Sequence, residues 1–108
     1  MEQSFYDQVF ELVRLIPMGR VSTYGAVAKS LGSGGSARMV GYAMSNAGAA
    51  EFPVPAHRVV NSSGLLTGKF HFDPPELMQE LLEKEGIQVK DDKVQDFKKL
   101  FWNPMVEL

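Results

Sequence analysis

Apolar residues recur at helical spacing through the first part of the chain. Between residues 5 and 16 they stand three or four positions apart, which places them on one face of an amphipathic helix. Ser4 stands where an N-cap belongs, and Pro17 and Gly19 follow where the helix must end. The apolar face consists of Phe5, Val9, Leu12, Val13 and Ile16. The pattern therefore predicts a first helix that is packed against a core.

Two shorter helices are predicted next. Ser22 or Thr23 can cap a helix over residues 24–31, which a glycine ends. A third helix is expected over residues 37–46, behind a turn of glycine and serine at residues 33–36. Two short helices joined by such a turn are typical of a helix-turn-helix. Simple packing of two helices against a core is the alternative, so the pattern favours DNA binding without establishing it.

The second half of the chain alternates short apolar runs with turn residues. Two valines at residues 59–60 and two leucines at residues 65–66 flank the sequence Asn-Ser-Ser-Gly. This pattern predicts a tight β-hairpin within residues 57–68. A fourth helix is expected to open at the Asp-Pro-Pro sequence of residues 73–75 and to end at Gly86. A last amphipathic stretch then closes the chain.

Length and composition fit one small domain. The chain has 108 residues, of which 44% are hydrophobic, enough for a modest core. We therefore predict a single, mainly α domain over residues 1–108, with a winged-helix-like helix-turn-helix and a minor β-hairpin. No secretory apolar region opens the sequence, and no apolar run approaches the roughly 20 residues of a membrane span. A cytoplasmic protein, associated with the nucleoid when bound to DNA, is expected.

The sequence contains no cysteine and only two histidines. Disulfides, thiolate metal sites and cysteine catalysis are therefore excluded, and neither a metal nor a cofactor is expected. The formal net charge of −2 argues mildly against nucleic-acid binding. However, residues 1–72 hold six Lys and Arg against four Asp and Glu, whereas residues 73–108 hold five against nine. The first two-thirds can thus still present a basic face.

The most informative segment is Pro55-Ala56-His57-Arg58-Val59. It resembles the active-site signature Pro-Cys-His-Arg-Val of the O6-alkylguanine-DNA alkyltransferases, with alanine in the cysteine position. Three more segments resemble the same family in the same order: residues 16–25, 37–41 and 81–86. The cysteine-free chain is similar to the alkyltransferase-like members of this family, which bind the lesion without accepting its alkyl group.

The alanine bears directly on the expected activity. Dealkylation needs a thiolate to attack the alkyl carbon. In the transferases a histidine draws the thiol proton through a water and a glutamate orients that histidine, and the resemblance places His57 and Glu85 in these positions. The methyl group of Ala56 offers neither a proton nor a lone pair. We therefore expect no catalysis, with His57 and Glu85 kept as a buried pair and Arg58 anchoring loops.

The resemblance also assigns residues to DNA. Arg38 is implied to be the finger that enters the duplex in place of an extruded base, and Tyr24 to press on the target phosphate. A flat, permanently charged guanidinium suits that position because it stacks on bases. Core packing is the alternative for Tyr24. Small residues near Gly41 allow close approach to a minor groove, and Ser45 and Thr23 complete the expected DNA-binding set.

The implied lesion pocket departs from the transferase pattern. Its expected residues are Pro55, Ala56, His57, Arg58, Val59, Lys69 and Glu85. Lys69 stands where transferases usually place a tyrosine against the alkylated oxygen, and Phe70 replaces a serine. Hydrogen bonding to the lesion is thus expected to differ, and Lys69 can instead hold a phosphate. Tyr42 replaces a small residue of the family, and the match of Asn46 to a hinge asparagine is open.

The partners implied by the resemblance are double-stranded DNA containing O6-alkylguanine and, beyond it, the proteins of nucleotide excision repair. A monomeric damage sensor of this kind would also block access by alkyltransferases. Two alternatives stay open. One is an engineered Cys-to-Ala form of an active transferase, against which Lys69 and the lack of an expected N-terminal domain both argue. The other is a helix-turn-helix transcriptional regulator, for which the chain shows no obvious dimerisation helix.

Overall fold

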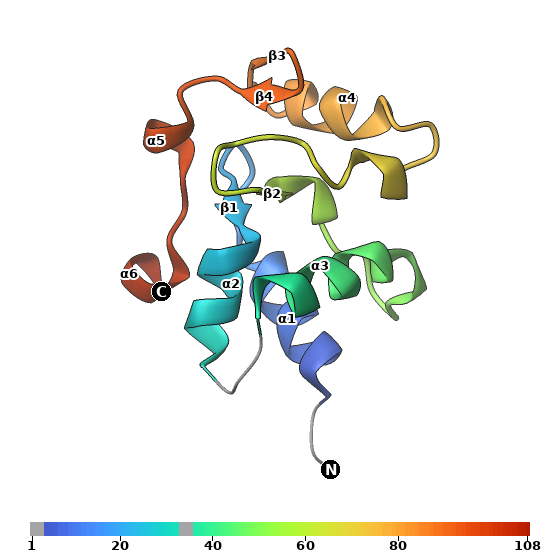
Figure 1. Cartoon of the computed structure of the whole chain (residues 1–108), viewed down its shortest axis with the longest axis vertical. Helices are drawn as coiled ribbons and strands as arrows, with labels where there is room; N and C mark the ends of the chain where they lie inside the picture. Colours follow the sequence, from blue (N-terminus) through green and yellow to red (C-terminus); the bar gives the residue numbers. More distant parts are fainter. Residues whose placement is uncertain (1–3, 33–35) are drawn as a thin grey trace.

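The computed structural model describes residues 4–32 and 36–108, and this part of the chain is mainly helical (Figure 1). Helices α1–α3 lie together at one end of the molecule and form the helical lobe. Helix α4 and strands β3 and β4 lie at the other end and form the hairpin lobe. The elements are α1 (Phe5–Arg14), β1 (Ser22–Thr23), α2 (Tyr24–Leu31), α3 (Ala37–Ser45), η1 (Ala47–Ala49), η2 (Ala56–Arg58), β2 (Val59–Val60), η3 (Lys69–His71), α4 (Leu77–Lys84), β3 (Val89–Lys90), β4 (Lys93–Val94), α5 (Phe97–Leu100) and α6 (Pro104–Glu107).

The helical lobe follows the predicted pattern of caps and apolar faces. Each of its helices begins with a hydroxyl that accepts a backbone N–H: Ser4 from Asp7 at 3.1 Å, Thr23 from Ala26 at 3.0 Å and Ser36 from Met39 at 3.2 Å. Such a cap stabilises a helix by about 1 kcal/mol. Gly32 ends α2 in the left-handed region, at a φ of 69°. The predicted glycine-serine turn lies largely outside the described residues, since 33–35 are not among them.

The two lobes bury separate cores. The first core, in the helical lobe, consists of Val9, Phe10, Leu12, Val13, Ile16, Val27, Ala28, Val40, Ala43, Met44, Val59 and Trp102. The second core, in the hairpin lobe, consists of Val21, Val60, Leu66, Met78, Leu82, Ile87 and Val94. Strands β1 and β2 pair in parallel between the lobes, with Ser22 opposite Val59 and Thr23 opposite Val60. The Ala-His-Arg-Val-Val segment is therefore fixed at the junction.

The position predicted for the β-hairpin is wrong. Residues 59–60 pair with β1, and Leu65 forms an isolated bridge with Lys93 rather than pairing with the valines. Both valines are buried, as in a strand that is covered on both faces. In sequence, two consecutive valines of such a strand look the same as one strand of a hairpin. The tight turn does form, since Gly64 N donates to Asn61 O at 2.9 Å. The antiparallel hairpin is β3–β4, whose turn residues Asp91 and Asp92 both have positive φ.

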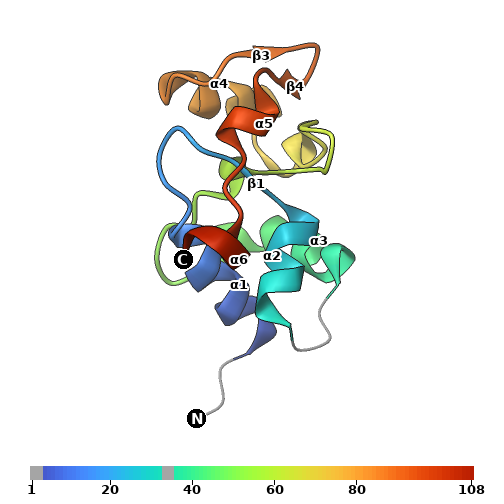
Figure 2. The ribbon, with the colours of Figure 1, turned by 90° about the vertical axis from the view of Figure 1, so that its left-hand side faces the viewer.

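The end of the chain returns to the helical lobe. Figure 2 shows the segment from α5 to α6 running alongside β1 and α2. Val21 forms two backbone hydrogen bonds with this segment: its N–H donates to Leu100 O at 3.1 Å, and its carbonyl accepts from Trp102 N at 2.7 Å. The tail therefore covers β1. No helix in the described ranges is long and apolar enough to cross a membrane.

Candidate nucleic-acid interface

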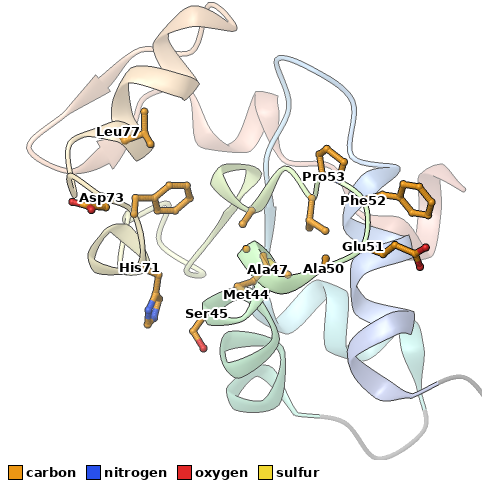
Figure 3. Close-up of a pocket in the computed structure, with 14 residues that line it drawn as sticks. Met44, Ser45, Ala47, Ala50, Glu51, Phe52, Pro53, His71, Asp73 and Leu77 are labelled. Carbon is orange, nitrogen blue, oxygen red and sulfur yellow. The ribbon is translucent and has the colours of Figure 1, made fainter.

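A pocket of about 620 Å³ opens where the loop after α3 faces the segment before α4 (Figure 3). Ala56 lies among its lining residues. The full lining is Met44, Ser45, Ala47, Gly48, Ala50, Glu51, Phe52, Pro53, Val54, Ala56, His71, Phe72, Asp73 and Leu77. Apart from Glu51, His71 and Asp73, these side chains carry no titratable group. A mostly apolar hollow of this size suits a planar base with an alkyl substituent.

Ala56 begins the short turn η2, directly after Pro55. Its N–H donates to Val54 O at 2.8 Å, and the N–H of Arg58 donates to Pro55 O at 3.0 Å. These bonds fix the backbone so that the half-buried methyl group faces the pocket while the next residues turn away from it. The pocket wall thus carries a methyl group at this position.

Behind Ala56 lies a network centred on Glu85. His57 Nε2 is 2.7 Å from Glu85 Oε2, and Arg58 Nη2 donates to the same oxygen at 2.8 Å. Gly19 N donates to Glu85 Oε1 at 3.1 Å, and Arg58 Nη1 donates to Ile16 O at 2.9 Å. The network ties together the ends of α1 and α4 and the turn η2.

The network also settles the charge of Glu85. Burial alone would raise the pKa of this carboxyl, but the hydrogen bonds from Arg58, His57 and Gly19 outweigh burial and lower the pKa to about 2. Glu85 is therefore ionised at neutral pH. Of the residues that the sequence predicts around a lesion, Ala56 lines this pocket, whereas Pro55, His57, Arg58, Val59, Lys69 and Glu85 are outside its lining. His57, Arg58 and Glu85 instead hydrogen-bond to one another behind Ala56.

Lys69 also lies outside the lining of the pocket. Its Nζ is 2.5 Å from Asp92 Oδ2 in the turn of β3–β4, and 5.3 Å from the centre of the Phe70 ring. The ammonium group is paired with this carboxylate at a partly exposed position, since the two side chains are 28% and 48% exposed. The turn η3 instead directs His71 and the following residues to the pocket (Figure 3). Sequence reasoning missed them because no motif marks them.

The outer face of α3 is exposed and carries one cation. Arg38 Nε donates to Tyr42 Oη at 2.8 Å, and its guanidinium lies 5.7 Å from the centre of the Tyr42 ring. A β-carbon added at Gly41 would meet no atom within 4 Å, so the space above this residue is open. Ser45 and Asn46 both donate to the carbonyl of Tyr42, at 2.7 and 2.8 Å. This face has no partner within the described residues.

Tyr24 and Thr23 are held more tightly. Burial raises the pKa of the Tyr24 phenol, which a hydrogen bond with Thr67 partly offsets, so the phenol is neutral at physiological pH. A β-carbon at Gly68 would lie 2.7 Å from Tyr24 Oη, so a larger residue there would require the phenol to shift. Thr23, expected to contact DNA, is 7% exposed and its hydroxyl caps α2, so its role here is to start that helix.

The described residues contain no group of three or more His, Asp or Glu that could hold a metal ion.

Comparison with known proteins gives the family. Residues 4–87 match the model of the 6-O-methylguanine DNA methyltransferase, DNA binding domain. The chain is 35% identical over 104 residues to alkyltransferase-like protein 1 of Schizosaccharomyces pombe, covering 93% of this chain and 95% of that protein. It is 37% identical over 100 residues to the DNA base-flipping protein of Vibrio parahaemolyticus, covering 93% of this chain and 97% of the relative.

Comparison with solved structures agrees with the comparison of sequences. The crystal structure of S. pombe Atl1 in complex with damaged DNA containing O6-carboxymethylguanine superimposes with a TM-score of 0.80. The two chains are 33% identical, and the match covers 94% of this chain and 98% of the other. The predicted fold class, a small mainly α domain, is confirmed. The chain belongs to the 6-O-methylguanine DNA methyltransferase DNA-binding family and resembles its alkyltransferase-like members.

Proposed function

We propose that this protein binds duplex DNA at O6-alkylated guanine, takes the alkylated base into the pocket beside Ala56, and leaves the alkyl group in place. The observation that carries the proposal is the position of Ala56 in the pocket lining, in a sequence without any cysteine. The names of the relatives, an alkyltransferase-like protein and a DNA base-flipping protein, support it. So does the damaged DNA bound by the structural neighbour.

Binding begins at the exposed face of α3. The small residues near Gly41 let the helix approach a minor groove, whose readout is degenerate and suits a protein that searches for damage rather than for sequence. Arg38 enters the stack in place of the rotated nucleotide, and Tyr24 holds the phosphate backbone beside it. Unstacking a base costs a few kcal/mol, which the wedge and the burial of the base in the pocket offset.

Behind the pocket, His57 and Arg58 both hydrogen-bond to Glu85, and the methyl group of Ala56 has no proton for His57 to accept. The role of this network in the proposed function is to keep η2 and the start of β2 in place. The lesion is held by shape and by the burial of apolar surface.

A bound and unreacted lesion persists until another protein acts on it. We propose that this monomeric protein marks the lesion for nucleotide excision repair and meanwhile shields it from alkyltransferases. Preincubation with the protein should slow the repair of O6-methylguanine by an active alkyltransferase in proportion to occupancy. An unchanged repair rate at saturating protein would argue against the shielding role.

The test of binding is a titration on two duplexes that differ only in guanine or O6-methylguanine at one position. We expect clear preference for the lesion, and mass spectrometry of the protein afterwards should show no added alkyl mass. Equal affinity for the two duplexes would contradict lesion recognition. An alkylated protein would contradict the assignment of an inert pocket.

A further inference from the structure

One wall of the pocket is tied to a side chain that lies outside it. Arg14 is the last residue of α1, and its guanidinium donates from Nε to the carbonyl of Pro53 at 3.1 Å. It donates from Nη2 to the carbonyl of Phe52 at 2.8 Å. The same group lies 5.9 Å from the centre of the Phe52 ring. One planar cation thus holds two consecutive carbonyls of a loop almost 40 residues away along the chain.

This loop has few other means of keeping its shape. The turn η1 closes with Ala50 N donating to Ala47 O at 3.2 Å, and the next backbone bond along the chain is from Ala56 N to Val54 O at 2.8 Å. Pro53 has no N–H to donate. The Phe52 side chain is 62% exposed, so burial does little to fix it. Among the described residues, the carbonyls of Phe52 and Pro53 accept hydrogen bonds only from Arg14.

The held segment is also pocket lining. Phe52, Pro53 and Val54 line the pocket together with Ala56, on the side opposite His71 (Figure 3). A wall that is already in place when the base arrives spares the ordering of loop residues on binding. A loose wall would have to order around each adduct, and the pocket would lose its defined width.

We propose that Arg14 is a positioning residue for lesion binding: by fixing residues 52–54 it sets the width of the pocket and hence which O6 substituents fit. The inference rests on the proposed function. It concerns selectivity among lesions, because Arg14 contacts the loop and lies at the end of α1, whereas general DNA binding is assigned to α3.

The chain contains a matched control. Arg20 makes the same kind of clamp, donating from Nε to Leu100 O at 2.9 Å and from Nη2 to Phe101 O at 2.7 Å. It also pairs with Glu107 at 3.0 Å. None of these residues lines the pocket. Arg20→Met therefore removes an equivalent clamp from the tail and leaves the pocket wall intact.

The experiment compares Arg14→Met and Arg20→Met with the wild type on duplexes containing guanine, O6-methylguanine or O6-benzylguanine. Equilibrium affinity, dissociation rate and melting temperature are measured for each protein. We expect Arg14→Met to weaken binding of both lesions about fivefold to twentyfold, the effect of losing two hydrogen bonds, through faster dissociation. Its ratio of benzyl to methyl affinity should change, and its affinity for guanine duplex should not. Arg20→Met should lower the melting temperature and keep all affinity ratios.

The outcomes separate the inference from the function on which it rests. If the wild type does not distinguish lesion from guanine, the proposed function fails. If the wild type does and Arg14→Met keeps the same preferences, or weakens all three duplexes equally, only the role of Arg14 is overturned. Should Arg14→Met not fold, Arg14→Lys is measured instead, since it keeps the charge but cannot bridge two carbonyls in one plane. A folded lysine variant with wild-type ratios would overturn the inference.

Discussion

At residue 56 alanine and cysteine differ by one sulfur atom, and behind Ala56 lies the hydrogen-bonded network of His57, Arg58 and Glu85. His57 lies 2.7 Å from Glu85, and both are almost fully buried. Replacing this network by apolar side chains would leave the pocket open but would remove what holds Gly19 and Ile16 against η2. Its retention in a chain without a thiol therefore has a structural reason.

Restoring the thiol tests this reading. Ala56→Cys should give weak alkyl transfer at best, because the ammonium group of Lys69 is paired with Asp92 and Phe70 replaces a residue that would support the leaving oxygen. Mass spectrometry after incubation with an O6-methylguanine duplex measures the added methyl group. Ala56→Ser is the control, since a hydroxyl is a poor nucleophile toward an alkyl carbon. Rapid, complete transfer by the cysteine variant would mean that Ala56 alone blocks catalysis.

The buried carboxylate predicts a dependence of stability on pH. The pKa of Glu85 is lowered from 4.5 to about 2, so its contribution to the free energy of unfolding is complete above pH 4.5. It is lost as the pH falls from about 5 to 2, by about 3 kcal/mol at most. Urea denaturation at a series of pH values measures this loss. Glu85→Gln should be less stable at pH 7 and should show a shallower decline with acid; parallel curves for the two proteins would contradict the assignment.

Among the elements, α3 presents its outer face to solvent while its inner face is buried through Val40, Ala43 and Met44. On the outer face the Arg38 side chain is held against Tyr42. If Arg38 enters DNA as proposed, this contact reduces the conformational freedom that the arginine loses on binding, and we expect Tyr42 to orient it.

Removing the guanidinium from α3 should weaken binding to the O6-methylguanine duplex by roughly 1–3 kcal/mol, the scale of base-stacking contacts. Fluorescence anisotropy with Arg38→Ala gives the value. Lys29→Ala, an exposed cation on α2, serves as the control for loss of charge alone. The finger assignment is wrong if the two variants bind alike.

How far the sequence predicts these elements depends on whether local residues or distant ones determine them. Helices α1–α3 carry their own caps and apolar faces, so their bounds could be predicted closely. Strand β2 could not be assigned its partner, because Val59–Val60 gains its parallel neighbour from residues 22–23, far away along the chain. In the site, the motif identifies Ala56, but the pairing of Lys69 with Asp92 depends on a hairpin that the pattern did not indicate.

On the scale of the whole molecule, the pocket is lined by residues of both lobes and is open to solvent rather than enclosed by either lobe. Its volume of about 620 Å³ exceeds what a methyl substituent requires. Under the function proposed above, no thiol has to be aligned with the alkyl carbon, so we expect larger O6 substituents to fit along the walls.

Affinity should change little, or rise, from O6-methyl through O6-butyl to O6-benzylguanine, because each buried Å² of apolar surface contributes roughly 25 cal/mol. Titrations across this series measure the trend. Ala56→Leu, which fills the space beside the base, should restore a penalty for bulk. A steep loss beyond methyl in the wild type would mean that the pocket is closed despite its alanine.

The parallel pairing of β1 and β2 has a consequence for how the molecule comes apart. Val59 is buried in the first core and the adjacent Val60 in the second, so one peptide bond joins the two. Unfolding of one lobe would therefore displace a buried residue of the other, and denaturation should be a single cooperative transition. Calorimetric and van't Hoff enthalpies should then agree, and the fluorescence of Trp102 in the first core should follow the same curve as loss of helix in α4. A bound duplex, whose extruded base would lie between the lobes, should raise the temperature of this single transition rather than split it into two.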